Sequence, residues 1–253
     1  MSKVLKLVRE RHSTRAPFNR GRPIAEQDLK QVLEAARWAP TAHNMQNFEI
    51  LVIDDKEVLE KIGKIRSPIP EEFIKENYEQ LSFSEEELLQ KKVGILGTFF
   101  PESWTTPPFN MDEIVREAGP IYLKDSIDDS PLVLVVMYDP RKRAPASAGD
   151  FLGVLSLGCV MENMWLVAED LGISFRILSE FGEDTMEKEL KKALNVPEHM
   201  KIAYAVRLGY PASKPTKNLR VRRDIEMFAH HNRYGNNGLD KEKSRKPQAY
   251  RRT

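Results

Sequence analysis

Apolar positions spaced three and four residues apart predict two helices near the start of the chain. Val4, Leu7 and Val8 lie on one helical stripe, which is typical of a short amphipathic helix that gives way to a loop. The spacing starts again after Ile24 and predicts a second helix, which ends before Pro40 because proline cannot continue it. A helix, a loop and a second helix therefore open the chain.

Residues 151–170 differ from these helices because they are apolar nearly all round. That pattern predicts one long helix, buried over most of its surface and ended by Gly172.

Two capping boxes predict the starts of further helices. Ser84 with Glu87 favours a helix over 85–92, and Asp184 with Glu187 favours one that runs through Ala193. In each box we expect the two side chains to satisfy backbone amides that the helix itself leaves unpaired.

Runs of β-branched and aliphatic residues predict four strands, at residues 48–53, 132–138, 174–178 and 202–208. The run LVLVVMY at 132–138 is the most apolar of them, and prolines close to both of its ends set its limits, so we expect it to be a central strand. The helices and strands together indicate a chain that mixes α and β structure.

Composition narrows the class of protein. The 253 residues include 39 Lys and Arg against 38 Asp and Glu, and the formal net charge of +1 creates no field that would attract nucleic acid or an anionic membrane. No apolar run reaches the roughly 20 residues of a membrane helix, and the first residues lack the apolar stretch of a signal peptide. A single cysteine excludes an internal disulfide, and no HExxH spacing indicates a metal site. We therefore expect a soluble, cytoplasmic protein that binds no metal, no nucleic acid and no membrane.

Three polar clusters carry candidate chemistry. Residues 11–15, RHSTR, combine two guanidinium groups with a hydroxyl and backbone amides, a set that suits a phosphate; the alternative is a solvated basic patch. Residues 39–46 place hydrogen-bonding side chains between a helix and a buried strand, although an ordinary polar turn has the same composition. Arg220, Arg222 and Arg223 follow the last strand, where a solvated face is the alternative.

The order and separation of four segments resemble the FMN-dependent nitroreductase family. These segments are RHSTR at 11–15, WAPTAHNMQNF at 38–48, ENMWLVAEDLGI at 162–173 and LGYP at 208–211. The resemblance spans nearly the whole chain and is weakest across residues 66–130.

The resemblance implies an α+β fold: a three-layer sandwich with a mixed, mainly antiparallel sheet, helices on both faces and an intertwined homodimer with FMN at its interface. It further implies one domain over residues 1–253, a variable lid or insert over 66–130, and a C-terminal extension over 212–253 that reaches the partner subunit.

The resemblance also implies which residues bind FMN. Arg11 and Ser13 would meet the phosphate and the ribityl chain, His12 would contribute mainly its backbone, and Arg15 would reach the pyrimidine side and favour the reduced flavin. The remaining implied contacts are Thr41, Asn44 and Gln46, across the dimer interface; Leu178, Ser179 and Glu180, at the N5 edge; and Arg220 and Arg222, at the phosphate.

The activity implied is that of an FMN-dependent oxidoreductase with a ping-pong mechanism. NADH or NADPH reduces the flavin, and a nitroaromatic, a quinone or a related small molecule then accepts the electrons. No catalytic side chain is expected, because flavin N5 carries the hydride. Aromatic residues that could form a lid over the flavin are Phe99, Phe100, Trp104, Phe109 and Tyr122, with ordinary core packing as the alternative. The alternative functions are a reductive dehalogenase, a flavin-modifying enzyme of the same superfamily, and a non-catalytic FMN-binding protein.

Overall fold

The computed structural model describes residues 2–69, 71–76, 82–97, 110–182, 184–213 and 219–236. The chain divides into two compact units. Unit 1 comprises Met1–Ser67 with Ile121–Pro215, and unit 2 comprises Pro68–Pro120 with Thr216–Thr253. Two short strands, β2 (Arg66–Pro68) and β5 (Pro120–Tyr122), pair with each other where the chain passes between the units.

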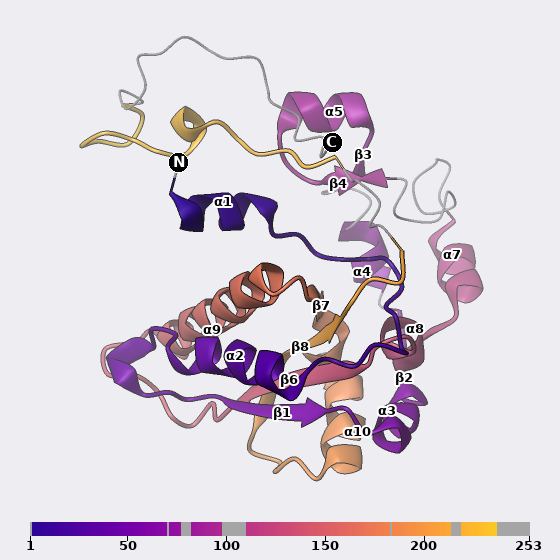
Figure 1. Cartoon of the computed structure of the whole chain (residues 1–253). Helices are drawn as coiled ribbons and strands as arrows, with labels where there is room; N and C mark the ends of the chain where they lie inside the picture. Colours follow the sequence, from indigo (N-terminus) through magenta and orange to yellow (C-terminus); the bar gives the residue numbers. More distant parts are fainter. Residues whose placement is uncertain are drawn as a thin grey trace. The chain divides into compact units, whose positions relative to one another are not determined.

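Unit 1 contains a four-stranded sheet and most of the helices (Figure 1). Its strands are β1 (Glu49–Ile53), β6 (Leu132–Tyr138), β7 (Ser174–Leu178) and β8 (Lys201–Gly209). Its helices are α1 (Lys3–Glu10), α2 (Glu26–Arg37), α3 (Lys56–Gly63), α8 (Leu123–Ile127), α9 (Phe151–Asp170) and α10 (Asp184–Leu194), with the 3-10 turns η1 (Ala42–Asn44) and η4 (Ser179–Gly182). The helices and strands predicted for this part of the chain are confirmed to within two residues at each end.

The sheet has the order β1-β6-β8-β7, and every pair of neighbouring strands in it is antiparallel. β6 is an interior strand whose residues are buried from Leu132 to Met137, which confirms the predicted central strand. The register places Val135 opposite both Leu51 of β1 and Ala205 of β8.

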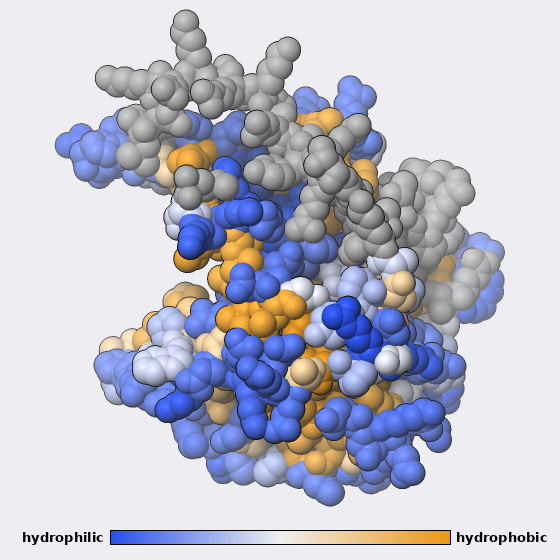
Figure 2. Space-filling view, in the orientation of Figure 1, coloured by the Kyte–Doolittle hydropathy of each residue, from blue (hydrophilic) through white to orange (hydrophobic). Residues whose placement is uncertain are grey.

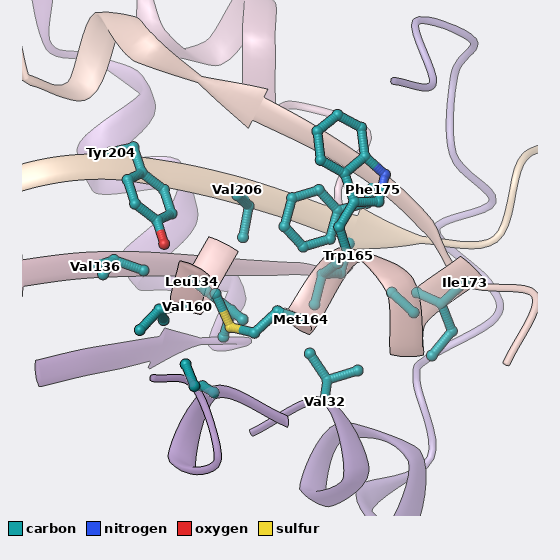
Figure 3. Close-up of a cluster of buried hydrophobic side chains, with 14 of the residues drawn as sticks. Val32, Leu134, Val136, Val160, Met164, Trp165, Ile173, Phe175, Tyr204 and Val206 are labelled. Atoms are coloured by element: carbon teal, nitrogen blue, oxygen red, sulfur yellow. The ribbon is translucent and has the colours of Figure 1, made fainter. Parts of the chain in front are cut away.

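Helices cover both faces of this sheet (Figure 1). On one face, Leu134 and Val206 pack with Val32 of α2 and Met164 of α9 (Figure 3). The other face carries α3, α8 and α10, whose apolar residues pack on Val133, Val135 and Ala205 of the strands. The predicted α+β fold with helices on both faces is confirmed.

A β-bulge in β8 shifts the alternation of its side chains between the two cores. Val136 lies opposite Tyr204 whereas Met137 lies opposite Ile202, so Ala203 has no partner on β6. Tyr204 faces the α9 side, as Val206 and Leu208 do, and its hydroxyl donates to the Leu157 carbonyl at 3.2 Å (Figure 3). Ile202 packs in the opposite core.

The bulge also explains why the predicted capping role of Glu187 is wrong. The Ile202 N–H donates to Glu187 Oε1 at 2.8 Å, and Lys191 Nζ lies 3.1 Å from the same oxygen. Asp184 is already the first helical residue of α10. The Glu187 carboxylate therefore accepts from the backbone of β8 and does not cap the start of α10.

The prediction for α9 needs two corrections. Leu157, Val160 and Met164 are buried, but Phe151 and Leu155 are 60% and 51% exposed, so the first turns of the helix are not in the core. By length and composition α9 is also apolar enough to cross a membrane. The prediction that no segment of the sequence reaches the length of a membrane helix is therefore wrong. A core helix of a soluble protein meets the same criterion.

Unit 2 contains α4 (Glu71–Glu76), β3 (Ser82–Phe83), α5 (Glu85–Lys91), β4 (Ile95–Leu96), α7 (Met111–Ala118) and η5 (Ile225–Met227). The predicted capping box of α5 is confirmed: the Glu87 N–H donates to Ser84 Oγ at 3.2 Å, and the Ser84 N–H donates to Glu87 Oε2 at 3.0 Å. These hydrogen bonds from Ser84 hold the pKa of Glu87 below its usual value. The predicted lid and C-terminal extension fall largely in unit 2, and their roles stay predictions.

Candidate functional site

The chain leaves α1 at Arg11 and runs alongside β7 as an extended segment, here called the arm (residues 11–19). Ser13 forms a parallel bridge with Phe175, and the Thr14 N–H donates to the Phe175 carbonyl at 3.1 Å. At the far end of the arm the Asn19 N–H donates to the Tyr210 carbonyl at 2.8 Å. Since β7 is the last strand of the sheet order, the arm pairs with an edge that would otherwise leave backbone groups unsatisfied.

Arg11 is held by α9. Its Nε donates to Glu162 Oε1 at 3.0 Å, and its guanidinium lies over the Trp165 ring at 4.5 Å from the centroid. The Trp165 ring stacks in turn on Phe175 at 4.9 Å (Figure 3). Because Glu162 takes only Nε, the two terminal nitrogens of Arg11 remain for an anionic ligand as far as the described residues go.

His12 and Thr14 point away from such a ligand. His12 Nδ1 lies 3.6 Å from Glu169 Oε1 of α9, and both ring nitrogens are buried without a hydrogen-bond partner among the described residues. Thr14 is 1% exposed, and its hydroxyl likewise has no partner in the described part of the chain. The predicted role of the His12 backbone stays a prediction.

Arg15 lies on the exposed side of the arm. Burial of part of its side chain and, second, the positive charge of Arg176 lower the pKa of Arg15. Arginine stays protonated at neutral pH even so, and two neighbouring guanidiniums create a positive potential that favours an anionic group. The arm thus presents Ser13 between two cationic side chains, those of Arg11 and Arg15.

The connection before β1 is strained. His43, Asn44 and Gln46 have φ values of 51°, 53° and 48°, a left-handed conformation that non-glycine residues adopt at a cost. Thr41 supports it, because its hydroxyl accepts from the Gln46 N–H at 3.1 Å, while Gln46 Nε2 donates to Asn44 Oδ1 at 3.2 Å.

This connection is tied to α9 and to the segment after β6. The Ala42 N–H donates to Ser156 Oγ at 3.0 Å. Asn47 Nδ2 donates to the Asp139 carbonyl at 2.9 Å, and the Asp139 N–H donates back to Asn47 Oδ1 at 3.1 Å. Its predicted contact with FMN across a dimer interface stays a prediction.

At the end of β7 and in the turn after it, residues 178–180 are the predicted contacts with the N5 edge. The side chains of Leu178 and Phe181 are fully buried, so Leu178 can address a ligand only through its main chain. Ser179 is exposed and Glu180 half-buried, and the negative charge of Glu180 acts on the Arg207 guanidinium near the arm. The structure therefore places Glu180 in the neighbourhood of the arm.

Arg220 and Arg222 belong to unit 2, so their predicted approach to the phosphate stays a prediction. Arg222 Nη1 donates to the Val221 carbonyl at 2.7 Å. As for metals, no group of three or more His, Cys, Asp or Glu among the described residues could hold an ion.

Several residues that shape the site were not predicted from the sequence. Glu162 and Trp165 hold Arg11, Arg176 flanks Arg15, and Arg207 with Asp129 fixes the far half of the arm. Arg176 and Arg207 carry a local signal, because each is a charged residue inside a largely apolar strand.

Comparisons with known proteins identify a family and proteins of similar fold. Residues 8–210 match the description "Nitroreductase family". An NADPH-dependent oxidoreductase of Staphylococcus aureus is 21% identical over 231 residues, which cover 91% of this chain and 74% of that protein. A nitroreductase with bound FMN from Desulfitobacterium hafniense superimposes with a TM-score of 0.54 at 21% identity, covering 91% of this chain and 99% of the other. An FMN-dependent nitroreductase from Clostridium difficile gives a TM-score of 0.54 at 16% identity, with coverages of 91% and 99%.

Proposed function

Because the chain belongs to the nitroreductase family, we propose that it is an FMN-dependent oxidoreductase that takes electrons from NADH or NADPH and passes them to a small acceptor, such as a nitroaromatic or a quinone. The observation that carries the proposal is the arm, which holds Ser13 between two guanidinium side chains along the edge of the sheet. The FMN in the related Desulfitobacterium structure and the NADPH dependence of the Staphylococcus relative support it.

The donor set of the arm fits FMN. A phosphate suits the terminal nitrogens of Arg11 together with the Ser13 hydroxyl, since guanidinium and phosphate form paired, charge-assisted hydrogen bonds. Arg15, further along the arm, suits the pyrimidine edge of the flavin, where negative charge gathers on reduction. Arg220 and Arg222 would complete the phosphate contacts, and the backbone at Leu178, Ser179 and Glu180 would border N5.

When bound, FMN supplies the hydride chemistry, so the chain needs no acid or base of its own. The residues of the arm would bind and orient the cofactor, and Arg15 would favour the negative charge of its reduced form. Donor and acceptor would bind one after the other, as in ping-pong kinetics. A cytoplasmic location agrees with this use of soluble nicotinamide donors.

Acceptor choice is proposed to rest with residues 95–123. Phe99, Phe100, Trp104 and Phe109 lie outside the described residues. The Tyr122 hydroxyl accepts from Arg66 Nη1 at 3.2 Å, and the Lys124 ammonium lies 5.2 Å from its ring centroid. Tyr122 thus lies beside the polar groups of Arg66 and Lys124, which an acceptor could contact together with its ring.

We further propose that the protein is a homodimer. Phe151, Val154 and Leu155 follow each other at helical spacing on α9 and are half exposed or more, and Trp38 is 73% exposed. Figure 2 shows orange apolar residues at the surface of unit 1 among blue polar ones. A second subunit would cover such residues and would bring Thr41, Asn44 and Gln46 to its FMN, while residues 212–253 would embrace it.

The test is an absorbance spectrum of the purified protein followed by anaerobic addition of NADH and then NADPH. We expect flavin bands that bleach with at least one nucleotide and recover with a quinone or nitroaromatic. Flavin bands that neither nucleotide bleaches would instead indicate a non-catalytic FMN-binding protein, and failure to bind added FMN would overturn the proposal.

A variant pair tests the phosphate assignment. Arg11→Ala combined with Arg222→Ala should give a folded protein that is largely free of flavin. Arg37→Ala is the matched control, because this arginine lies on the exposed face of α2 and, in the described part of the chain, pairs with its sequence neighbours Glu34 and Trp38 alone. Full FMN occupancy in the double variant would contradict the assignment.

A further inference from the structure

Arg207 is an arginine in the middle of the buried strand β8. It is 3% exposed, and its neighbours Val206 and Leu208 are fully buried. Burial, followed by the charge of Arg176 directly opposite on β7, lowers the pKa of Arg207. Its Nε has no hydrogen-bond partner among the described residues. A charge in this place weakens the core, since an apolar residue would avoid both costs.

The contacts of the Arg207 guanidinium connect it to the arm, directly and through Asp129. Nη1 forms an ion pair with Asp129, and Nη2 donates to the Ala16 carbonyl at 3.2 Å. The guanidinium also lies over the Phe18 ring, 4.3 Å from the centroid. Asp129 closes the arrangement, because its Oδ2 accepts from the Phe18 N–H at 2.7 Å.

These contacts, here called the clamp (Arg207 with Asp129), act on backbone groups just after Arg15. Pairing with Phe175 fixes the arm at Ser13 and Thr14, and the clamp fixes it at Ala16 and Phe18. Arg15 therefore lies between two fixed points. Backbone bonds from Ala212 to Pro17 and from Asn19 to Tyr210 hold the arm further along, and the clamp is the anchor nearest to Arg15 on that side. The cost of burying the Arg207 charge is therefore offset by the orientation that the charge gives to the arm.

We propose that Arg207 and Asp129 are positioning residues that hold the arm so that Ser13 and Arg15 meet the flavin. The proposal rests on the proposed FMN chemistry. Because Arg207 is buried and both residues bond to backbone groups of the arm, the clamp would set flavin affinity and flavin potential through that backbone.

The first measurement is FMN affinity, by fluorescence titration of the full-length apoprotein. Arg207→Met keeps the apolar stem and removes the charge, and we expect the Kd for FMN to rise about 10- to 100-fold, the loss typical of hydrogen bonds to a charged group. Arg207→Lys can keep the ion pair with Asp129 but cannot also reach Ala16, so an intermediate Kd is expected. Asp129→Asn retains an acceptor for Phe18 and should also be intermediate.

The matched control is Glu187→Gln, which alters a buried ion pair at the opposite end of β8. It should lower thermal stability yet leave the Kd for FMN within twofold of wild type. A purely structural role for the clamp would instead make both sets of variants lose flavin in proportion to their loss of stability.

Two readouts separate positioning from general destabilisation. At saturating FMN, Arg207→Lys and Asp129→Asn should make the flavin potential more negative, because Arg15 no longer sits at the pyrimidine edge, while Glu187→Gln should not. In the apoprotein, the Phe18 amide should exchange with solvent faster in the clamp variants. Wild-type Kd and potential in both Arg207→Lys and Asp129→Asn would overturn the proposal, even if Arg207→Met fails to fold. Failure of the wild type to bind FMN would overturn the proposed function, and unchanged Phe18 exchange would then reject the clamp independently.

Discussion

At the scale of single residues, Gly209 shows how closely the arm approaches the sheet. A Cβ at this position would lie 2.6 Å from Phe18 Cδ2 and 2.9 Å from Pro131 Cδ, closer than such atoms pack. Phe18 is 3% exposed and is enclosed by these contacts. Only glycine leaves room for the arm here.

Gly209→Ala should therefore lower the free energy of unfolding by about 1–3 kcal/mol, the usual cost of overpacking, and should weaken FMN binding as the arm shifts. Urea denaturation and flavin titration measure the two effects. Gly153→Ala in α9 is the control, since nothing lies within 4 Å of its added Cβ, and it should be neutral or slightly stabilising. Wild-type stability in Gly209→Ala would contradict the close approach.

Asp139 gives a pH-dependent prediction. Hydrogen bonds from Arg141 Nε and Nη2, each 2.9 Å long, hold the pKa of Asp139 well below its usual range. A carboxyl whose pKa is lower in the folded state stabilises the fold above its unfolded pKa of about 3.9, and this contribution is lost as the pH falls below that value.

Asp139→Asn should thus be less stable than wild type at neutral pH, with a difference that shrinks as the pH falls below about 4. Urea unfolding across that range measures it. Arg141→Met removes the same pair from the other side and should behave alike, whereas a difference independent of pH would reject this account.

At the scale of elements, α9 divides into a core half and a surface half. Met164 is fully buried, so Met164→Ala should cost about 2–5 kcal/mol by leaving a cavity. Leu155 is half exposed, and Leu155→Glu should leave the subunit folded but shift it from dimer to monomer. Denaturation and light scattering check the two outcomes, and a dimer that survives Leu155→Glu would reject α9 as part of the interface.

The bounds of the elements followed from the sequence because they depend on local signals. Pro131 and the run after it set β6, and Ser84 with Glu87 set the start of α5. The surface of α9 was not predictable, because apolar character alone does not say which residues a helix buries within its own chain. The prediction for Glu187 was wrong because its spacing from Asp184 is that of a capping box, while its actual partner, the Ile202 N–H beside the bulge, leaves no local sign in the sequence.

At the scale of the whole molecule, the candidate site was predictable only where a motif carried it. RHSTR identified the arm by resemblance, and the structure places Arg11, Ser13 and Arg15 along it. The contacts that fix the arm join residues far apart in sequence, 151 positions for Arg11 with Glu162 and 78 for Asp129 with Arg207. No local pattern shows such pairs.

The pairing of the arm with late strands also has a consequence for synthesis. The arm leaves the ribosome well before its partners Phe175 and Tyr210, which lie far along the chain from it. Long-range pairing of this kind closes slowly, so nascent chains that stop before β8 should hold an unattached arm. Under the proposed function, FMN binding then follows the pairing of the arm with β7 and with the segment after β8, so flavin occupancy would report that this pairing has formed.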